Sequence, residues 1–440
     1  MSGHRPSDRL NSPDPALTRR AFLKRAAMGT GAALAFPTIV PSSVFGANAP
    51  SNRIVLGAIG LGSMGTNNME GFLGRDDVQF VAVCDIDHDR LEKGRMMVND
   101  QYGNEDCTPY ADFRDLIAHP GLDAVSIATP DHWHAVAAIT AARGGLDIYG
   151  EKPFSHDLKA GRAMCDAVSR YGRVWQTGSW QRSEENFHIA CELVRNGRIG
   201  KVHTVEVGLP DGHFREDPPV QPPPPNLDWN RWLGPAPWTP YRGVAHWDWR
   251  WVLAWGGGQM LDWIGHHADI AHWGLDLDRT GPVSVQGSGE FPGGAVFNAP
   301  IAYRFTCRYA NGVEMIVANS SQQPMNMGTR WIGDKGWIWV TRGGFKSEPA
   351  GLIHERIGPG ETRLTFSRDH RGDFIECVRN RQVTIAPAEI SHRSASVGHL
   401  GQIAMLTGRR IHWDPDTETI IDDPGASALL GRACRQPWTL

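Results

Sequence analysis

Three side chains in this chain of 440 residues could move a proton to or from a hydroxyl group. They are Lys152, Asp262 and His266, the last two standing four residues apart after a run of three glycines. A lysine ammonium stabilises the alkoxide that forms when a hydrogen-bonded hydroxyl loses its proton. An imidazole whose pKa is near neutrality can accept that proton. These residue types therefore predict conversion of an alcohol to a ketone, if a hydride acceptor lies beside them.

The same residues also allow other interpretations. Lys152 could instead be an exposed residue of a turn. Asp262 and His266 share one face of a helix with about 6 Å between their Cβ atoms, which also suits metal ligands. His267 and Asp269 add further donors. Because no distant cysteine or carboxylate is implied as a further ligand, we expect no metal.

A glycine-rich loop predicts the hydride acceptor. The apolar run at residues 54–59 leads into Gly-Leu-Gly-Ser-Met-Gly at residues 60–65, and a second apolar run ends on Asp85. The first glycine permits a tight turn, the second lets the backbone approach a pyrophosphate, and the third lets the next helix pack closely. Asp85 would bind both ribose hydroxyls and repel a 2′-phosphate, so we expect NAD rather than NADP. The predicted cofactor-binding residues are Gly60, Gly62, Ser63, Met64, Gly65, Asp85, Thr129, Pro130, His132, Glu151 and Lys152.

Aromatic residues predict the substrate class. Nine of the seventeen tryptophans fall between Trp229 and Trp273, and residues 247–251 alternate tryptophan with Asp and Arg. Some of these indoles must belong to a core. Others, beside charged groups, suit a carbohydrate or glycoside, whose C–H faces stack while its hydroxyls form hydrogen bonds. The residues that we expect at the substrate are His134, Trp180, Arg182, Trp249, Arg250 and His267; either histidine of the His132-Trp-His134 stretch could instead be structural.

Alternating strand and helix patterns must position these residues. Strands are expected at 54–59, 79–84, 124–128, 147–149 and 174–177, with helices at 66–73, 90–99, 134–142 and 158–171. Such alternation predicts an α/β fold with a doubly wound parallel sheet, a Rossmann domain at residues 50–177. Ligands of such sheets lie beyond the carboxyl ends of the strands, where the loop and Lys152 both fall.

A change of pattern at about residue 178 predicts a second domain, residues 178–440. Longer strands are expected at 202–209, 301–309, 314–319 and 337–340, with helices near 184–196 and 259–273. This predicts an α+β domain with a largely antiparallel sheet and helices on one side. Its open face could pair with another copy, so we expect a homo-oligomer, a dimer or a tetramer. The proline-rich stretch 210–225 should be an extended surface loop.

Residues 1–49 have the features of a signal peptide and linker. Arg19 and Arg20 form a twin-arginine pattern before a weakly apolar stretch and small residues at 46–49. The apolar stretch is too short for a stable membrane span; an amphipathic or disordered leader is the alternative. We therefore expect the twin-arginine export machinery as a partner and a periplasmic or otherwise exported protein. Because this route exports folded proteins, the cofactor should be bound before export and held tightly.

Composition gives no support for several other classes of protein. The seven cysteines are scattered, which predicts neither a disulfide framework nor a zinc site. The formal charge of −4 gives no support for binding to nucleic acid or to anionic membranes.

Taken together, these stretches resemble the glucose–fructose oxidoreductase/inositol dehydrogenase/rhizopine-catabolism family, written Gfo/Idh/MocA. The glycine loop, Glu151-Lys152-Pro153 and the Asp262-x-x-x-His266 helix carry the resemblance. Residues 129–134, 232–237, 392–395 and 437–440 are similar to an exported subgroup with a twin-arginine leader. The resemblance implies that Lys152 polarises the reacting hydroxyl, that His266 is the general base, and that Asp262 positions the substrate or His266.

Three functions remain open at this point. The first is an exported, NAD-dependent oxidoreductase that acts on a sugar, polyol or glycoside hydroxyl. The second is a glycosidase or lyase that oxidises a sugar carbon transiently, cleaves the bond, and returns the hydride with no net redox change. The third, a binding protein without catalysis, is disfavoured because Lys152, Asp262 and His266 are all present.

Overall fold

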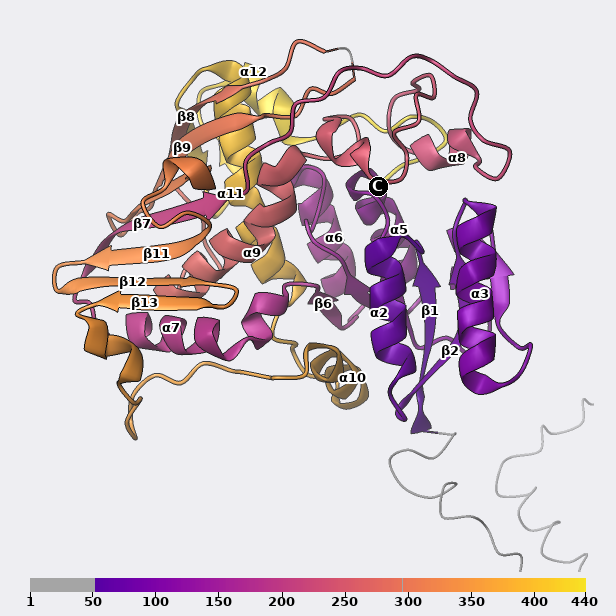
Figure 1. Ribbon diagram of the computed structural model, residues 1–440, viewed down its shortest axis with the longest axis horizontal. Coiled ribbons are helices and arrows are strands. Elements are labelled where there is room, and N and C mark those ends of the chain that lie inside the picture. Colours follow the sequence, from indigo (N-terminus) through magenta and orange to yellow (C-terminus); the bar gives the residue numbers. More distant parts are fainter. Residues whose placement is uncertain (1–51, 295) are drawn as a thin grey trace, which may run out of the picture. The chain divides into compact units, whose positions relative to one another are not determined.

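Six parallel strands form the first sheet, in the order β3-β2-β1-β4-β5-β6 (Figure 1). The computed structural model describes residues 52–294 and 296–440, and the predicted leader at 1–49 lies outside them. The strands are β1 (Ile54–Ile59), β2 (Val78–Cys84), β3 (Thr108–Tyr110), β4 (Ala124–Ile127), β5 (Asp147–Gly150) and β6 (Trp175–Thr177). Of these six strands, only the short β3 was not expected from the sequence. The strand order is that of dinucleotide-binding sheets, which confirms the Rossmann prediction.

Helices connect these strands and cover both faces of the sheet. They are α2 (Ser63–Leu73), α3 (His88–Tyr102), α4 (Phe113–Ile117), α5 (Asp131–Arg143) and α6 (Leu158–Arg170). β4 and β5 are buried along their whole length, as expected when both faces of a parallel sheet are covered. The order of the strands reverses between β1 and β4, so a crevice opens at their carboxyl ends.

A nine-stranded sheet forms the second domain, in the order β13-β12-β11-β7-β10-β9-β8-β14-β15. Only β7 and β10 pair in parallel, which confirms the largely antiparallel prediction. The strands are β7 (Val202–Leu209), β8 (Ser284–Glu290), β9 (Ala302–Arg308), β10 (Glu314–Asn319), β11 (Gly328–Gly333), β12 (Gly336–Thr341), β13 (Gly344–Glu348), β14 (Ile411–Asp414) and β15 (Thr419–Ile420).

Three long helices pack against this sheet: α7 (Glu185–Arg195), α9 (Gly258–Leu275) and α11 (Ala388–Thr407). Figure 1 shows α9 and α11 between the sheet and the Rossmann domain, and α11 also contacts α6. The remaining α-helices after β6 are α8 (Trp229–Leu233), α10 (His370–Asn380) and α12 (Pro424–Ser427). α10 returns to the first domain, where Phe374 and Ile375 join the core around β1 and β2. No helix in the described part of the chain is long and apolar enough to cross a membrane.

The tryptophan-rich segment forms a separate core of its own. Trp229, Trp232, Trp249, Trp251 and Trp255 are all buried in one cluster with Leu227 and Phe297. Trp229 and Trp232 stack with ring centroids 4.8 Å apart, and both meet the Trp255 ring edge-on. These five tryptophans therefore stabilise this segment through apolar burial, and two of them, Trp232 and Trp249, also line a cleft.

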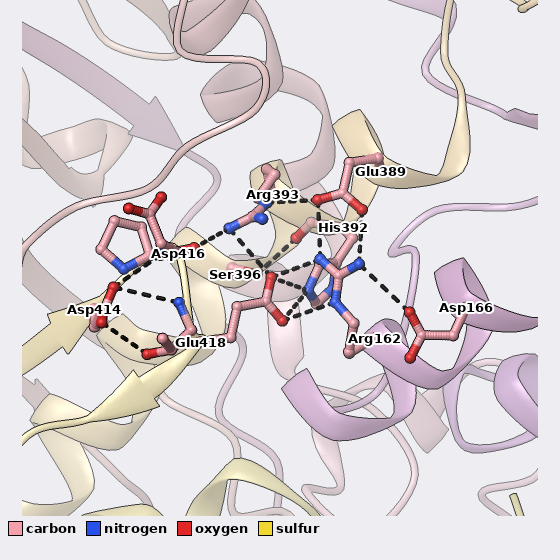
Figure 2. A network of polar contacts seen from close by, with 11 residues as sticks. Arg162, Asp166, Glu389, His392, Arg393, Ser396, Asp414, Asp416 and Glu418 are labelled. Carbon is pink, nitrogen blue, oxygen red and sulfur yellow. Dashed lines mark hydrogen bonds and ion pairs between the residues drawn. The ribbon is translucent and has the colours of Figure 1, made fainter. Parts of the chain in front are cut away.

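An ion-pair network joins α6 to α11 and to the β14–β15 turn (Figure 2). The guanidinium of Arg162 donates two hydrogen bonds to Glu389, of 2.8 and 2.9 Å, and two to Glu418, of 2.7 and 2.9 Å. His392 Nε2 lies 3.0 Å from Glu418 Oε1. Burial opposes ionisation of Glu389, but hydrogen bonds from Arg162 and Arg393 outweigh it and lower the pKa of that carboxyl to about 2. Arg162 thus fastens the Rossmann domain to the second domain.

We expect Arg162→Ala to lower the free energy of unfolding by about 3 kcal/mol, because two partly buried carboxylates lose their shared partner. The pKa of Glu389 is depressed in the folded state, so its stabilising contribution is present above pH 4.5 and is lost as the pH falls towards 2. Urea unfolding at pH 7 and at pH 3 measures both effects. Arg368→Ala, at an exposed pair with Glu185, is the control and should change stability by less than about 1 kcal/mol. Equal losses in the two variants would contradict the role of Arg162.

Candidate active site

A cleft of about 780 Å³ lies at the carboxyl ends of β1, β2, β4 and β5. This volume is within the range of cofactor and substrate sites. One end is lined by the glycine loop and Asp85, and the other by Lys152, Asp262 and His266. The predicted cofactor loop and the predicted proton-transfer residues therefore share one continuous cleft.

The glycine loop fits a dinucleotide in its local geometry. Gly60 has a φ of +88°, and a Cβ there would lie 2.7 Å from the Ala128 carbonyl oxygen. A Cβ on Gly65 would lie 1.9 Å from the Gly60 carbonyl oxygen, so Gly65 is needed for packing and does not line the cleft. Gly62 lines the cleft, where a Cβ would meet only the Arg90 guanidinium, at 3.3 Å. The N-terminus of α2, with Ser63 at its start, faces this space and suits a pyrophosphate.

Asp85 lies at the end of β2, where a ribose carboxylate is expected. Its Oδ2 accepts a hydrogen bond of 2.7 Å from the Leu61 amide and its Oδ1 one of 2.9 Å from the Asp87 amide. These bonds fix the carboxylate against the loop, and its side chain lines the cleft. Burial raises the pKa of Asp85, while the two amides lower it. Arg90, which the sequence analysis did not single out, lines the cleft nearby.

The nicotinamide end of the cleft contains Thr129, Pro130 and Glu151. The Thr129 hydroxyl is buried and has no hydrogen-bond partner within residues 52–294 and 296–440, so it is available to a bound group. Glu151 Oε1 accepts a hydrogen bond of 2.8 Å from Asn68, and burial raises the pKa of its carboxyl. These residues, with the glycine loop and Asp85, could hold NAD along the whole cleft.

A segment of the second domain covers the Asp85 end of the cleft. The Asn226 side chain donates to Asp87 at 3.0 Å, and the His88 amide donates to the Asn226 carbonyl at 2.8 Å. His246 Nε2 lies 3.2 Å from Asp87 Oδ2. The cleft-lining residues from this segment and from the C-terminus are Leu227, Arg231, Trp232, Ala245, His246, Trp247 and Trp438. A nucleotide bound here would be enclosed by both domains.

Lys152 and Asp262 form an ion pair at the end of the cleft opposite Asp85. Lys152 Nζ lies 2.8 Å from Asp262 Oδ1, although the two residues are 110 positions apart in the sequence. Their side chains are 15% and 17% exposed, so the pair is accessible from the cleft only in part. Arg250 Nε approaches the same oxygen at 3.9 Å. A substrate hydroxyl beside Lys152 would therefore meet an ammonium whose position Asp262 fixes.

His266 stands one helical turn after Asp262 on α9 and lines the cleft. Burial and the positive charges of Lys152 and Arg342 lower the pKa of its imidazole well below the usual value. Arg342 Nη2 lies 3.4 Å from His266 Nε2, which requires Nε2 to be the unprotonated nitrogen. A neutral imidazole with its lone pair on Nε2 is the form that can accept a proton, once the Arg342 hydrogen bond to that atom is released.

Asp131 also lines the cleft, and the sequence analysis missed it as a site residue. It begins α5 immediately after Pro130 and is 4% exposed. Burial and the negative charge of Asp262 raise the pKa of its carboxyl to about 8, against the opposing charges of Arg250 and Lys152. At neutral pH the group is therefore mostly protonated and can donate a hydrogen bond. Its position shortly after β4, at the carboxyl edge of the sheet, could have predicted Asp131 as a site residue.

Three predicted substrate residues line the cleft, Trp180, Trp249 and Arg250. The Arg250 guanidinium lies between the rings of Trp247 and Trp249, 4.3 and 4.4 Å from their centroids. Trp180 is stacked in a similar way beneath the guanidinium of Arg371, at 4.4 Å. Arginine–tryptophan stacks thus form part of the wall around Lys152 and Asp262.

Four other residues that were predicted to contact a ligand do not line the cleft. Arg182 is 2% exposed and pairs with Asp269 at 2.6 Å and Asp278 at 2.7 Å. His267 is fully buried against Trp263, on the inner face of α9. These groups stabilise the second domain rather than contacting a substrate.

His132 and His134 are the other two predicted ligand contacts that do not line the cleft. His132 Nε2 lies 3.0 Å from the Trp232 carbonyl, so the residue joins α5 to the tryptophan cluster. The ring nitrogens of His134 lie 2.8 Å from the Pro153 carbonyl and 2.9 Å from the Thr129 carbonyl. Neither residue lines the cleft, and both rings are held by these backbone carbonyls. His134 can act on a ligand only by positioning Thr129 and the residues beside Lys152.

Within the described ranges, no group of three or more His, Cys, Asp or Glu side chains is arranged to hold a metal ion. Asp262, the alternative metal ligand, is instead paired with Lys152. All seven cysteines are free thiols, and six of them are buried.

Comparison with known proteins supports the nucleotide site. Residues 54–179 match the family model described as "Oxidoreductase family, NAD-binding Rossmann fold", and residues 211–440 match "Oxidoreductase family, C-terminal alpha/beta domain". The myo-inositol 2-dehydrogenase of Thermotoga maritima is 31% identical over 179 residues, which cover 41% of this chain and 49% of that enzyme. A glycosyl hydrolase family 109 protein of Stenotrophomonas maltophilia is 28% identical over 243 residues, or 52% of this chain and 50% of that protein. The matches thus span about half the length of these curated relatives.

The fold is also similar to solved structures. The WlbA dehydrogenase of Bordetella pertussis, solved with NADH and UDP-GlcNAcA, superposes with a TM-score of 0.60 at 19% identity. The superposition covers 82% of this chain and 99% of that one. With both of its domains matched by the family models, the chain belongs to the Gfo/Idh/MocA family of oxidoreductases and has its NAD-binding Rossmann fold.

Proposed function

We propose that this protein is an exported, NAD-dependent oxidoreductase that transfers a hydride between a sugar, polyol or glycoside hydroxyl and a tightly bound nicotinamide cofactor. The observation that carries the proposal is the approach of Lys152 Nζ to Asp262 at 2.8 Å, in a cleft that also contains His266 and the glycine loop. The names of relatives, which include a myo-inositol dehydrogenase, support a polyol or sugar substrate.

Each residue of the site has a separate role in the proposed oxidation of the hydroxyl. NAD, when bound, supplies the acceptor for the hydride that leaves the carbinol carbon. Lys152 donates a hydrogen bond to the carbinol oxygen and stabilises its developing negative charge. His266 Nε2 accepts the hydroxyl proton, so that the products are a ketone, a reduced cofactor and an imidazolium. Asp262 holds the ammonium of Lys152 in place.

Tight retention of the cofactor is supported by the cover over the Asp85 end of the cleft. Hydrogen bonds from Asn226 and the contact of His246 with Asp87 would have to open before a bound nucleotide could leave. Export through the twin-arginine route rests on Arg19, Arg20 and the residues after them. A homo-oligomer is proposed because α7, α9 and α11 pack against one face of the nine-stranded sheet, which leaves its other face for a second copy.

The segment that covers the Asp85 end of the cleft also favours a second candidate, a glycosidase or lyase with no net redox change. In that cycle a ring carbon is oxidised to a ketone, the neighbouring C–H becomes acidic, and the aglycone leaves by elimination. In a glycosidase water would then add to the resulting double bond, whereas a lyase would omit this step, and in both the ketone would be reduced by the hydride returned from the cofactor. A protein of glycosyl hydrolase family 109 is among the relatives.

A panel of polyols, free sugars and aryl glycosides tests the proposal and separates the two candidates. The protein is purified with its cofactor, and reduced nicotinamide and released aglycone are followed together. Reduced nicotinamide without aglycone release supports the oxidoreductase. Aglycone release without accumulation of reduced nicotinamide supports the second candidate, and silence in both signals across the panel contradicts both.

A further inference from the structure

Arg342 has no role in the proposed reaction, yet its guanidinium lies at the end of the cleft that contains Lys152 and His266. It lies in the turn between β12 and β13, and its guanidinium carbon is 5.0 Å from the centroid of the Trp263 ring. Its Nη2 is 3.4 Å from His266 Nε2, so it borders the proposed proton acceptor. Its side chain is 42% exposed and lines the cleft. A ligand that approaches His266 would therefore meet this guanidinium.

The other cations of this end are already engaged. Lys152 pairs with Asp262 at 2.8 Å, and Arg250, which is held between two tryptophan rings, approaches the same carboxylate. Arg371 donates to Asn67 and packs over Trp180.

Like Arg250 and Arg371, Arg342 has no acid within hydrogen-bond distance in the part of the chain that the structure describes, but unlike them it borders His266. The single carboxylate within 4.0 Å of Arg342 in residues 52–294 and 296–440 is Glu184, at 3.9 Å from Nε. That distance is beyond a hydrogen bond. Its one hydrogen bond, to the neutral His266 imidazole, is long at 3.4 Å. A guanidinium fork in this state can take a carboxylate in a bidentate pair.

We infer that Arg342 binds a carboxylate of the substrate, and that the protein acts on sugar acids such as hexuronates or their glycosides. This inference rests on the proposed function and narrows its substrate class. Because Arg342 and His266 are 3.4 Å apart, a ring whose hydroxyl reaches His266 would bring a carboxylate on an adjacent or nearby carbon to Arg342. The indole of Trp263 would border the same ring, because it lies beneath Arg342 and 5.3 Å from the His266 ring.

Carboxylate binding would also prepare the proton acceptor. In the present geometry Arg342 Nη2 donates to His266 Nε2, the atom that must receive the hydroxyl proton. A carboxylate that takes the guanidinium frees this lone pair for the substrate hydroxyl. The negative charge of the carboxylate beside His266 also offsets the charge of Arg342 and favours protonation of the imidazole during the reaction. A neutral sugar supplies neither effect.

Calorimetric titration of the NAD-bound protein tests the inference without requiring turnover. The probes are matched sets of a hexuronate, its neutral hexuronamide and the parent hexose, with glucose and galactose stereochemistry, together with the hexose 6-phosphates. We expect one hexuronate to bind about tenfold to a hundredfold more tightly than its amide. Arg342→Gln should abolish that preference and Arg342→Lys should retain part of it. Lys346→Gln, which removes an exposed charge from the same hairpin, should leave it unchanged.

Equal binding of acid and amide by the wild-type protein, or a preference that survives Arg342→Gln, would overturn the inference. Tighter binding of a hexose 6-phosphate than of every hexuronate would also overturn the choice of a carboxylate. Reduction of the bound cofactor is recorded in the same samples and reports on the proposed function separately. Arg342-dependent binding of a hexuronate without reduction would leave the inference standing and count against the oxidoreductase; reduction by neutral sugars with no preference for acids would do the reverse.

Discussion

Replacing Lys152 by methionine should slow hydride transfer about a thousandfold while the protein keeps its cofactor. Methionine retains most of the apolar stem of lysine but removes the ammonium that lies 2.8 Å from Asp262. The developing alkoxide then loses its hydrogen-bond donor, and Asp262 is left without its nearest cation. Rapid mixing of the NAD-bound protein with an active sugar measures the rate of cofactor reduction directly.

Two controls make this result specific to the ammonium. The amount of NAD released on denaturation should be the same in Lys152→Met as in the wild type, because the glycine loop and Asp85 are untouched. Lys93→Met removes an exposed lysine from α3 of the same domain and should leave the rate unchanged. A Lys152→Met protein that reduces its cofactor at a near-normal rate would remove Lys152 from the chemistry.

The second large effect is expected at His266. His266→Gln should reduce the rate by about a hundredfold to ten-thousandfold, the usual worth of a general base. Glutamine can still form hydrogen bonds but cannot accept the proton. The residual activity should also lose the acid limb of its pH profile, which a purely structural defect would not remove.

The wild-type pH profile follows from the environment of His266. Burial and the charges of Lys152 and Arg342 lower its pKa below the ordinary value of 6.5, so the imidazole stays neutral down to lower pH. We therefore expect kcat/KM to be flat at neutral pH and to fall only below pH 6.5, as the base becomes protonated. An acid limb centred above pH 7, or one that persists in His266→Gln, would contradict the assignment of His266 as the base.

The elements predicted correctly from the sequence are those whose own residues show a clear pattern of apolar positions. β1, β7 and β10 have the predicted limits of 54–59, 202–209 and 314–319. α11, although it has twenty residues, was missed because it is buried on almost every side and shows little amphipathic contrast. β8 was missed for the opposite reason, since its residues are mostly small or polar and only Val285 is buried.

Site residues that directly follow strands of the parallel sheet could be predicted from the sequence. Site residues that reach the cleft only through tertiary contacts could not. The loop at 60–65 and Lys152 follow strands of one parallel sheet, so their meeting at one edge could be inferred. Arg342 comes from a hairpin of the other sheet and reaches His266 across 76 residues of sequence, without any local signal. His132 and His134 are buried because helix α5 begins at Asp131, earlier than expected, and places both residues within it.

Single-turnover reduction of the bound cofactor tests the central claim most directly. The purified protein is denatured in one sample to count its NAD, and a second sample is mixed with the sugar and sugar-acid panel while reduced nicotinamide is followed. We predict about one NAD per chain and, with an active substrate, reduction of that NAD in the wild type but not in Lys152→Met. A protein that contains no NAD and cannot bind it, or equal reduction in the two proteins, would contradict the account.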